Sequence, residues 1–123
     1  MAISSAESVV METVWRRSPL SAEEIFAEVG ETQGWALQTL KTLLGRLVEK
    51  KALAATKDGR RFLYRPLIAR EDYVANESQN LVDRLFGGRL APLVAHFSER
   101  EALSPDDIRE LKQLIRKLDN GSR

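Results

Sequence analysis

Residues 36–66 read ALQTLKTLLGRLVEKKALAATKDGRRFLYRP, and this stretch predicts a helix followed by a β-hairpin. At about 100° per residue, the helix (residues 36–50) has an apolar arc and a polar arc. The apolar arc comprises Leu37, Leu40, Leu43, Leu44, Leu47 and Val48. The polar arc comprises Gln38, Thr39, Lys41, Thr42, Gly45, Arg46 and Glu49. Because Gln, Thr, Lys and Arg side chains can reach base edges and phosphates in a major groove, the polar arc indicates a helix that contacts DNA.

Gly45 is unexpected in the middle of this helix, where glycine costs about 1 kcal/mol of stability relative to alanine. Close approach to a DNA backbone explains it, and tight packing against another helix explains it equally well.

The hairpin is predicted from Asp58-Gly59, which lies between two short extended runs, residues 53–57 and 60–66. Asp-Gly in this setting is a strong hairpin signal. Three cations flank its tip: Lys57, Arg60 and Arg61.

Two helices are predicted before residue 36. Ser4–Glu7 and Ser21–Glu24 both read as capping boxes, which mark helix N-termini. The first helix should stop before Ser18-Pro19, because the residue before proline avoids helical angles. The second should end near Gly30. Three helices followed by a hairpin with a basic tip is the order of a winged helix-turn-helix, whose third helix enters the major groove while the wing touches the backbone beside it.

The rest of the chain is predicted to be helical: a helix over about 69–86, an apolar segment over 90–97 and a last helix capped by Ser104. These segments have apolar faces and little core of their own, which favours a symmetric homodimer. The alternative is that they fold back on the N-terminal domain. The fold class is therefore mostly α with a small β-hairpin wing, with a winged-helix domain over residues 1–68 and a helical dimerisation region over 69–123. The predicted dimerisation residues are Val74, Leu81, Leu85, Leu93, Val94, Phe97, Ile108, Leu111 and Ile115.

Charge is concentrated in one block. Residues 36–65 carry eight basic and two acidic residues, whereas the whole chain has a net charge of +1. A local basic stripe suits phosphate-backbone binding, although charge alone is equally consistent with a solvated surface.

Catalysis is not expected. The chain has no cysteine and a single histidine, His96, so a His/Cys metal site cannot be assembled. There is no nucleophile elbow or phosphate-cradling glycine loop. We therefore predict no enzyme activity, no metal and no cofactor. No apolar run approaches the ~20 residues of a membrane helix and no secretion signal precedes the first helix, which predicts a cytoplasmic protein without membrane insertion.

Several motifs, taken in order, resemble those of the penicillinase repressor family, which includes the methicillin-resistance and copper-responsive repressors. They are Ile3-Ser4-Ser5-Ala6-Glu7, Thr39-Leu40-x-Thr42-Leu43-x-x-Arg46-Leu47, Lys50-Lys51-Ala52-Leu53, Phe86-Gly87-Gly88, Leu93-Val94-x-x-Phe97 and Leu103-Ser104-x-Asp106-x-Ile108. The resemblance spans nearly the whole chain. It implies a homodimer that binds a palindromic operator in double-stranded DNA and represses transcription, here of antibiotic-response (β-lactamase-type) genes.

The resemblance also assigns residues. Gln38, Thr39, Lys41, Thr42 and Arg46 become the major-groove reading face, and Lys57, Arg60 and Arg61 become wing contacts to phosphate. Family members often carry lysine where this chain has Gln38, and glutamine suits adenine edges.

The resemblance further implies a route of release. Antibiotic-responsive members are cut before a phenylalanine under the control of a membrane sensor metalloprotease, and the matching bond is His96–Phe97. The family's usual residue before the cut is asparagine, and packing of His96 and Phe97 in a dimer core is an equal alternative. Copper sensing through a cysteine cluster is excluded.

Two other functions are consistent with a winged helix. One is a regulator released by a small-molecule ligand, which needs a pocket in or beside the helical region. The other is a protein–protein interaction module, which needs an apolar face on the third helix.

Overall fold

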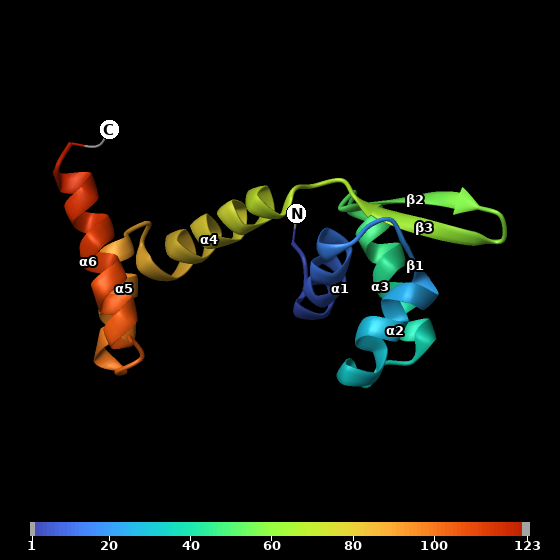
Figure 1. Ribbon diagram of the computed structural model, residues 1–123, viewed down its shortest axis with the longest axis horizontal. Coiled ribbons are helices and arrows are strands. Elements are labelled where there is room, and N and C mark those ends of the chain that lie inside the picture. Colours follow the sequence, from blue (N-terminus) through green and yellow to red (C-terminus); the bar gives the residue numbers. More distant parts are fainter. Residues whose placement is uncertain (1, 122–123) are drawn as a thin grey trace. The chain divides into compact units, whose positions relative to one another are not determined.

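The computed structural model describes residues 2–121, which form six helices and three short strands (Figure 1). In chain order these are α1 (Ser5–Arg16), β1 (Leu20–Ser21), α2 (Ala22–Gln33), α3 (Leu37–Glu49), β2 (Leu53–Asp58), β3 (Arg61–Pro66), α4 (Arg70–Phe86), α5 (Leu90–Glu99) and α6 (Pro105–Asp119). The chain divides into two compact units, one up to Val74 and one from Ala75.

Both capping boxes of the first unit are confirmed. The hydroxyl of Ser4 accepts from the backbone N–H of Glu7 at 3.1 Å, and Ser21 accepts from Glu24 at 3.1 Å. In each box the glutamate carboxylate also accepts a hydrogen bond from the backbone N–H of the serine. Helix α1 ends at Arg16, before Ser18-Pro19 as predicted.

The predicted end of the second helix is wrong. Helix α2 passes through Gly30 and continues to Gln33, and Gly34 stops it in the left-handed conformation, with φ +71°. Beyond this glycine, the backbone N–H of Trp35 donates a hydrogen bond to the carbonyl of Gly30 at 2.9 Å, which caps the C-terminal end of the helix. Gly30 has a packing role instead, because a Cβ built there would lie 2.5 Å from the ring of Phe26.

The core of the first unit lies where α1, α2 and α3 bring their apolar faces together. Val10 and Val14 of α1 and Ile25 of α2 are fully buried with Leu40 and Leu44 of α3. Burial of the leucine arc on α3 sets the orientation of the opposite, polar arc.

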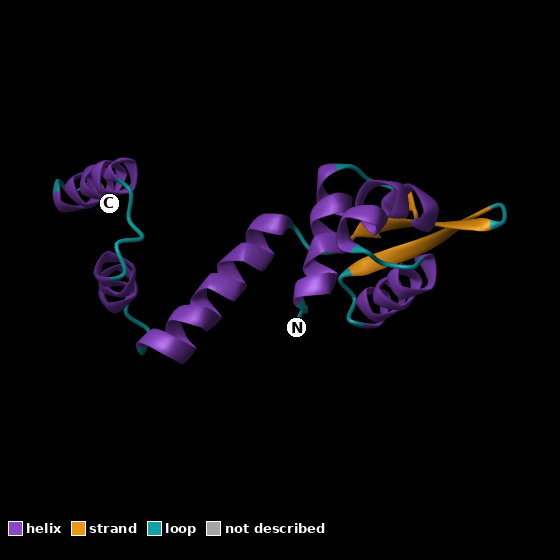
Figure 2. Cartoon of the chain, turned by 90° about the horizontal axis from the view of Figure 1, so that it is seen from below, coloured by secondary structure: helices purple, strands orange, loops and turns teal. Residues whose placement is uncertain are grey.

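The sheet contains one strand that the sequence does not predict. Figure 2 shows the strands together as one small sheet. Strand order is β1-β3-β2, all antiparallel, with Leu20 of β1 opposite Tyr64 and Thr56 of β2 opposite Leu63. Strand β1 has only two residues and depends on β3 for its pairing.

The hairpin turn lies one residue later than expected. Asp58 pairs with Arg61, so the two-residue loop is Gly59-Arg60 and not Asp58-Gly59. Gly59 adopts φ +66°, as the first loop residue of a type II′ hairpin requires. Three helices with this small sheet and its projecting β2–β3 hairpin form a winged helix-turn-helix, which confirms the predicted fold class.

The start of α4 is fixed to α1 within the first unit. Trp15 Nε1 donates to the carbonyl of Ile68 at 2.9 Å, and Arg70 Nε pairs with Glu12 Oε1 at 2.9 Å. The rings of Trp15 and Tyr73 also contact, with centroids 5.4 Å apart.

The second unit contains the rest of α4, together with α5 and α6. Ser104 caps α6 in a third capping box and Pro105 occupies its first turn, as predicted. Within residues 75–121, Val82 is the one buried side chain. No helix of the described chain is both long and apolar enough to cross a membrane.

Candidate nucleic-acid interface

Helix α3 exposes its whole polar arc. Gln38, Thr39, Lys41, Thr42 and Arg46 are all exposed, as are Gly45 and Glu49. On the opposite side Leu40, Leu43, Leu44 and Leu47 are buried, and Leu37 and Val48 are half-buried. The structure therefore places the five predicted reading residues together on one accessible face.

Lys50 holds the C-terminal end of α3 in place. Its Nζ donates to Glu7 Oε1 at 2.5 Å and to the carbonyl of Ala2 at 2.7 Å. Glu7 is only 1% exposed, so this ion pair ties the end of α3 to the buried first turn of α1.

The environment of Glu7 favours its ionised form. Burial raises the pKa of its carboxyl, but the hydrogen bonds from Lys50 and Ser4 and the charge of Lys50 outweigh burial and hold the pKa below its ordinary value of 4.5. Glu7 is therefore charged at neutral pH and anchors the end of α3 through its ion pair with Lys50.

The cations on the polar arc of α3 are available to a ligand. Within residues 2–121, no carboxylate lies within ion-pair distance of Lys41 or Arg46. Thr42 is partly committed, because its hydroxyl donates to the carbonyl of Gln38 at 3.0 Å.

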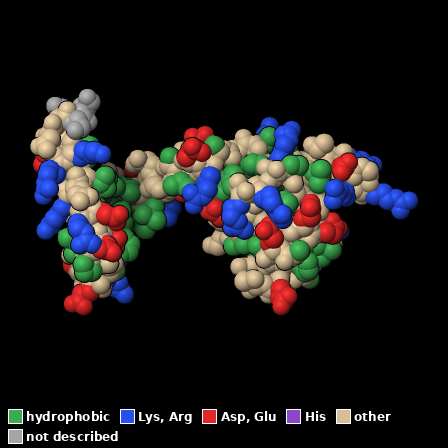
Figure 3. All heavy atoms as spheres, in the orientation of Figure 1, with side chains coloured by type: hydrophobic (Ala, Val, Ile, Leu, Met, Phe, Trp, Pro, Cys, Tyr) green, Lys and Arg blue, Asp and Glu red, His purple; other side chains and the backbone are tan. Residues whose placement is uncertain are grey.

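The hairpin carries the second group of cations. Lys57, Arg60 and Arg61 are exposed, and Figure 3 shows basic side chains gathered at the free end of the β2–β3 hairpin. Arg61 pairs with Asp58 at 3.4 Å across the turn. Its positive charge is thus partly neutralised, whereas the described residues offer no ion-pair partner to Lys57 or Arg60.

Acidic side chains also lie near the hairpin tip. A surface hollow is lined by Glu23 and Glu24 at the start of α2 and by Asp58, Arg60 and Arg61 of the hairpin. Hydrogen bonds from Ser21 are the largest cause that lowers the pKa of Glu24, and the charge of Arg61 adds to them. Sequence patterns do not reveal this proximity, because the two segments are brought together only by the β1–β3 pairing.

Phe62 is a feature of the wing that the sequence does not single out. Its side chain is 49% exposed and lies opposite Lys57 across the hairpin. The available signal is its place in the strand, one residue beyond the half-buried Leu63 and Tyr64 towards the tip.

The predicted dimerisation residues lie on the surface of the chain. Seven of them are exposed and the other two, Leu93 and Leu111, are half-buried; the exposed ones are Val74, Leu81, Leu85, Val94, Phe97, Ile108 and Ile115. Leu90, Leu114 and Leu118 are exposed as well, and the prediction does not include them.

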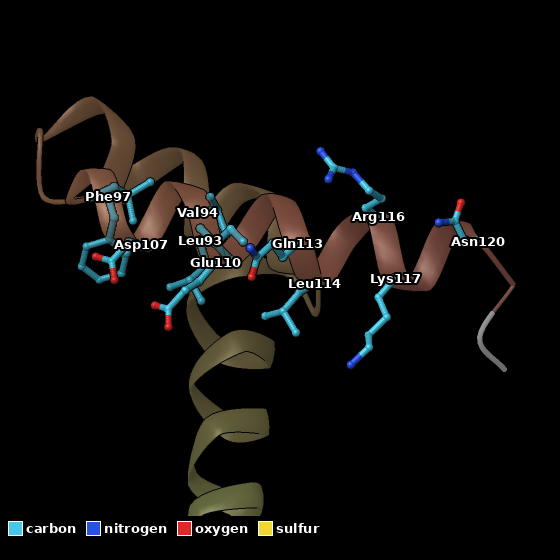
Figure 4. A pocket seen from close by; sticks show the side chains of 12 residues that line it. Leu93, Val94, Phe97, Asp107, Glu110, Gln113, Leu114, Arg116, Lys117 and Asn120 are labelled. Carbon is cyan, nitrogen blue, oxygen red and sulfur yellow. The ribbon is translucent and has the colours of Figure 1, made fainter.

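A groove of about 820 Å³ runs between α5 and α6. Figure 4 shows Leu93, Val94 and Phe97 of α5 lining it together with Leu114 of α6. Asp107 and Glu110 line it towards the start of α6, and Arg116 and Lys117 towards its end.

His96 and Phe97 lie in the last turns of α5, and both are exposed. Their rings contact each other with centroids 5.4 Å apart, and His96 also approaches Phe86 of α4 at 6.1 Å. The bond between them is therefore on the surface but within a helix.

Comparison with known proteins gives a consistent picture. The family model described as "Penicillinase repressor" matches residues 3–117. The chain is 37% identical over 113 residues to the penicillinase repressor of Bacillus licheniformis, covering 92% of this chain and 88% of that protein. It is 35% identical over 115 residues to the methicillin resistance regulatory protein MecI of Mammaliicoccus sciuri, covering 94% of each.

A solved structure extends the similarity to three dimensions. The chain is similar to the monomeric form of Bacillus licheniformis BlaI determined in complex with the blaP half-operator, with a TM-score of 0.52 and 40% identity. The match covers 59% of this chain and 89% of that one.

Proposed function

The chain belongs to the penicillinase repressor family, and from this membership we propose that it is a transcriptional repressor that binds operator DNA of β-lactam-resistance genes in the cytoplasm. The observation that carries the proposal is the exposed polar arc of α3, whose cations are unpaired within the described chain, in the same unit as a cationic hairpin. The relatives are named as repressors and regulators, and one was solved with a half-operator.

Each part of the interface has its own task. Arg46 and Lys41 suit hydrogen bonds to guanine edges, and Gln38 suits adenine. Lys57 and Arg60 supply charge for the phosphate backbone, which adds affinity without sequence information. The arc holds no apolar side chain, which argues against a protein–protein interaction module.

The repressor acts as a homodimer in this proposal. The second unit buries only Val82 among its described residues and exposes large apolar side chains on α4, α5 and α6, so it needs a partner surface. The groove beside α6 is acidic towards one end and basic towards the other. A two-fold axis that sets α6 antiparallel to its copy brings opposite charges together, so the surface complements itself. Two reading helices can then address half-sites one DNA turn apart, about 34–36 Å.

Release follows from loss of the dimer, since two half-site contacts reinforce each other only while they are linked. Cleavage of the His96–Phe97 bond, governed by a membrane sensor metalloprotease, is the proposed trigger. The bond is exposed on α5, but the protease must first unwind the last turns of the helix. A small-molecule ligand in the α5–α6 groove is the competing trigger, and purified dimer that dissociates on ligand addition without cleavage identifies it.

Arg46→Ala tests the DNA-reading face. Loss of one bidentate base contact costs about 1–3 kcal/mol, so affinity for the DNA upstream of the protein's own gene should fall about 5- to 150-fold. Fluorescence anisotropy measures the affinity, and unchanged thermal unfolding shows that the fold is intact. Arg84→Ala, an exposed arginine of α4, is the matched control and should bind normally. Equal affinities for the two variants would remove α3 from the interface.

A further inference from the structure

Gly45 occupies the outward face of the reading helix without any structural need for glycine. Its backbone is not in the left-handed region, which in the described glycines is confined to Gly34, Gly59, Gly87, Gly88 and Gly121. Apart from its chain neighbours and the backbone of its own helix, a Cβ built at Gly45 meets no atom of residues 2–121 within 4 Å. Packing within the chain, one of the two explanations open from sequence, is therefore excluded.

Gly30 of α2 can be compared with Gly45 as a second glycine inside a helix. Unlike at Gly45, a Cβ there would collide with the ring of Phe26 at 2.5 Å. The first unit thus contains one helical glycine that packing requires and one that packing leaves free.

The neighbours of Gly45 show what the open space faces. Residues three and four positions away lie nearest to it on the helix, and these are Lys41, Thr42, Val48 and Glu49. Lys41, Thr42 and Glu49 are exposed, as is Arg46 beside it, whereas Val48 is half-buried at the edge of the core. The missing side chain therefore leaves a gap within the row of polar side chains proposed to enter the major groove.

We propose that Gly45 is the point at which the backbone of α3 comes into van der Waals contact with the floor of the DNA major groove. The inference rests on the proposed DNA-binding function. The absence of a side chain sets the depth of α3 in the groove, so that the shorter Gln38 and Thr42 side chains reach base edges alongside Arg46. Any side chain at residue 45 holds the helix away from the bases and weakens several contacts together.

The proposal predicts that replacing Gly45 raises the stability of the fold and lowers the affinity for DNA. Gly45→Ala replaces a poor helix former where nothing obstructs the methyl group, so the Tm should rise by about 4 °C. Affinity for the DNA upstream of the gene should nevertheless fall at least about fivefold, the lower end of the loss expected for a bidentate base contact. A purely structural role for residue 45 predicts higher stability without any loss of binding.

Gly45→Lys distinguishes the effect of side-chain size at this position from the effect of added positive charge. On a face that only attracts phosphate, an added cation strengthens binding; at a point of contact, the larger side chain weakens it beyond the alanine variant. Gln79→Lys adds the same charge on the exposed surface of α4 and is the matched control, with affinity within about twofold of the unmodified chain.

The full-length protein and the DNA upstream of its gene, with a scrambled duplex beside it, serve for every measurement. Selective binding by the unmodified chain, with a higher Tm and weaker binding for Gly45→Ala and still weaker binding for Gly45→Lys, is the expected result. If the unmodified chain binds selectively and both variants bind as tightly or more tightly, the inference is overturned and the proposed function stands. If the unmodified chain shows no selectivity, the proposed function is overturned and the inference with it.

Discussion

At the scale of single residues, Glu7 and Lys50 join the fold to the interface. Glu7 completes the capping box of α1 and, in the same position, accepts a hydrogen bond from Lys50 at the end of α3. A buried carboxylate is stable only when its charge is compensated, and here Lys50 and the backbone of Ser4 supply the compensation. The ionised form of this buried acid therefore adds a tie at the C-terminal end of α3 to the packing of its leucine arc.

This pair predicts a pH dependence of stability. The pKa of Glu7 is lower in the folded state than in the unfolded state, so its contribution is complete above the unfolded pKa and is lost as the pH falls through the folded pKa, below about 4.5. Glu7→Gln keeps the capping box but removes the charge. At pH 7 it should cost about 1.5–3 kcal/mol, the range for a hydrogen bond to a charged group.

Urea unfolding at pH 7 and pH 3 measures this effect. The unmodified chain should lose more of its unfolding free energy between the two values than Glu7→Gln does. Glu31→Gln, on the exposed surface of α2, is the control and should follow the unmodified chain. Equal losses for all three would show that Glu7 is not a compensated charge in the fold.

At the scale of elements, local signals predict the helices well because each capping box and the leucine arc of α3 act within a few residues. The predictions of element boundaries fail where a contact with another part of the chain determines the local structure. Gly30 resembles a helix stop in the sequence, although its role is to make room for Phe26, and the true stop is Gly34. Strand β1 and the one-residue shift of the hairpin turn follow from pairing with β3, which no local pattern encodes.

The exposed polar arc of α3 can be predicted from periodicity, whereas the pairing of cations in the basic block cannot. Lys50 and Arg61 count as basic residues in the sequence, but the structure pairs them with Glu7 and Asp58. The exposed surface therefore carries less positive charge than the composition of residues 36–65 implies.

The wing predicts a difference between its two arginines. Arg60→Ala should weaken binding to the DNA upstream of the gene and to the scrambled duplex equally. It should also reduce the slope of log affinity against log salt by about 0.9 for each phosphate that is no longer neutralised. Arg61→Ala should change the slope less, because Asp58 already neutralises part of its charge. Anisotropy titrations at several salt concentrations give both slopes; a larger change for Arg61 would reverse the assignment.

At the scale of the whole molecule, the two units differ in how much of their apolar surface they bury by themselves. The first has a closed core formed by three helices and the sheet, whereas the second exposes most of its large apolar side chains. A second copy of the chain is the proposed cover, and it also doubles the DNA contacts.

The dimer is tested by Leu114→Asp, which puts a charge into the α5–α6 groove at a residue that is 57% exposed in the single chain. The unmodified chain should sediment as a dimer at micromolar concentration and the variant as a monomer. Operator affinity should fall by about 10²–10⁴ with the loss of linkage between half-sites. Lys112→Asp, on the same helix but outside the groove lining, is the control. A variant that remains dimeric would place the interface elsewhere.

Repression of transcription requires first that the full-length protein bind the DNA upstream of its own gene, which fluorescence anisotropy measures at two salt concentrations beside a scrambled duplex. We predict tight binding that prefers the upstream DNA at both concentrations and weakens as salt increases, because phosphate contacts supply affinity and base contacts supply selectivity. Equal, weak binding to both duplexes, repeated across a library of random DNA, would contradict the proposed function and leave the basic face of α3 and the wing as solvated surface.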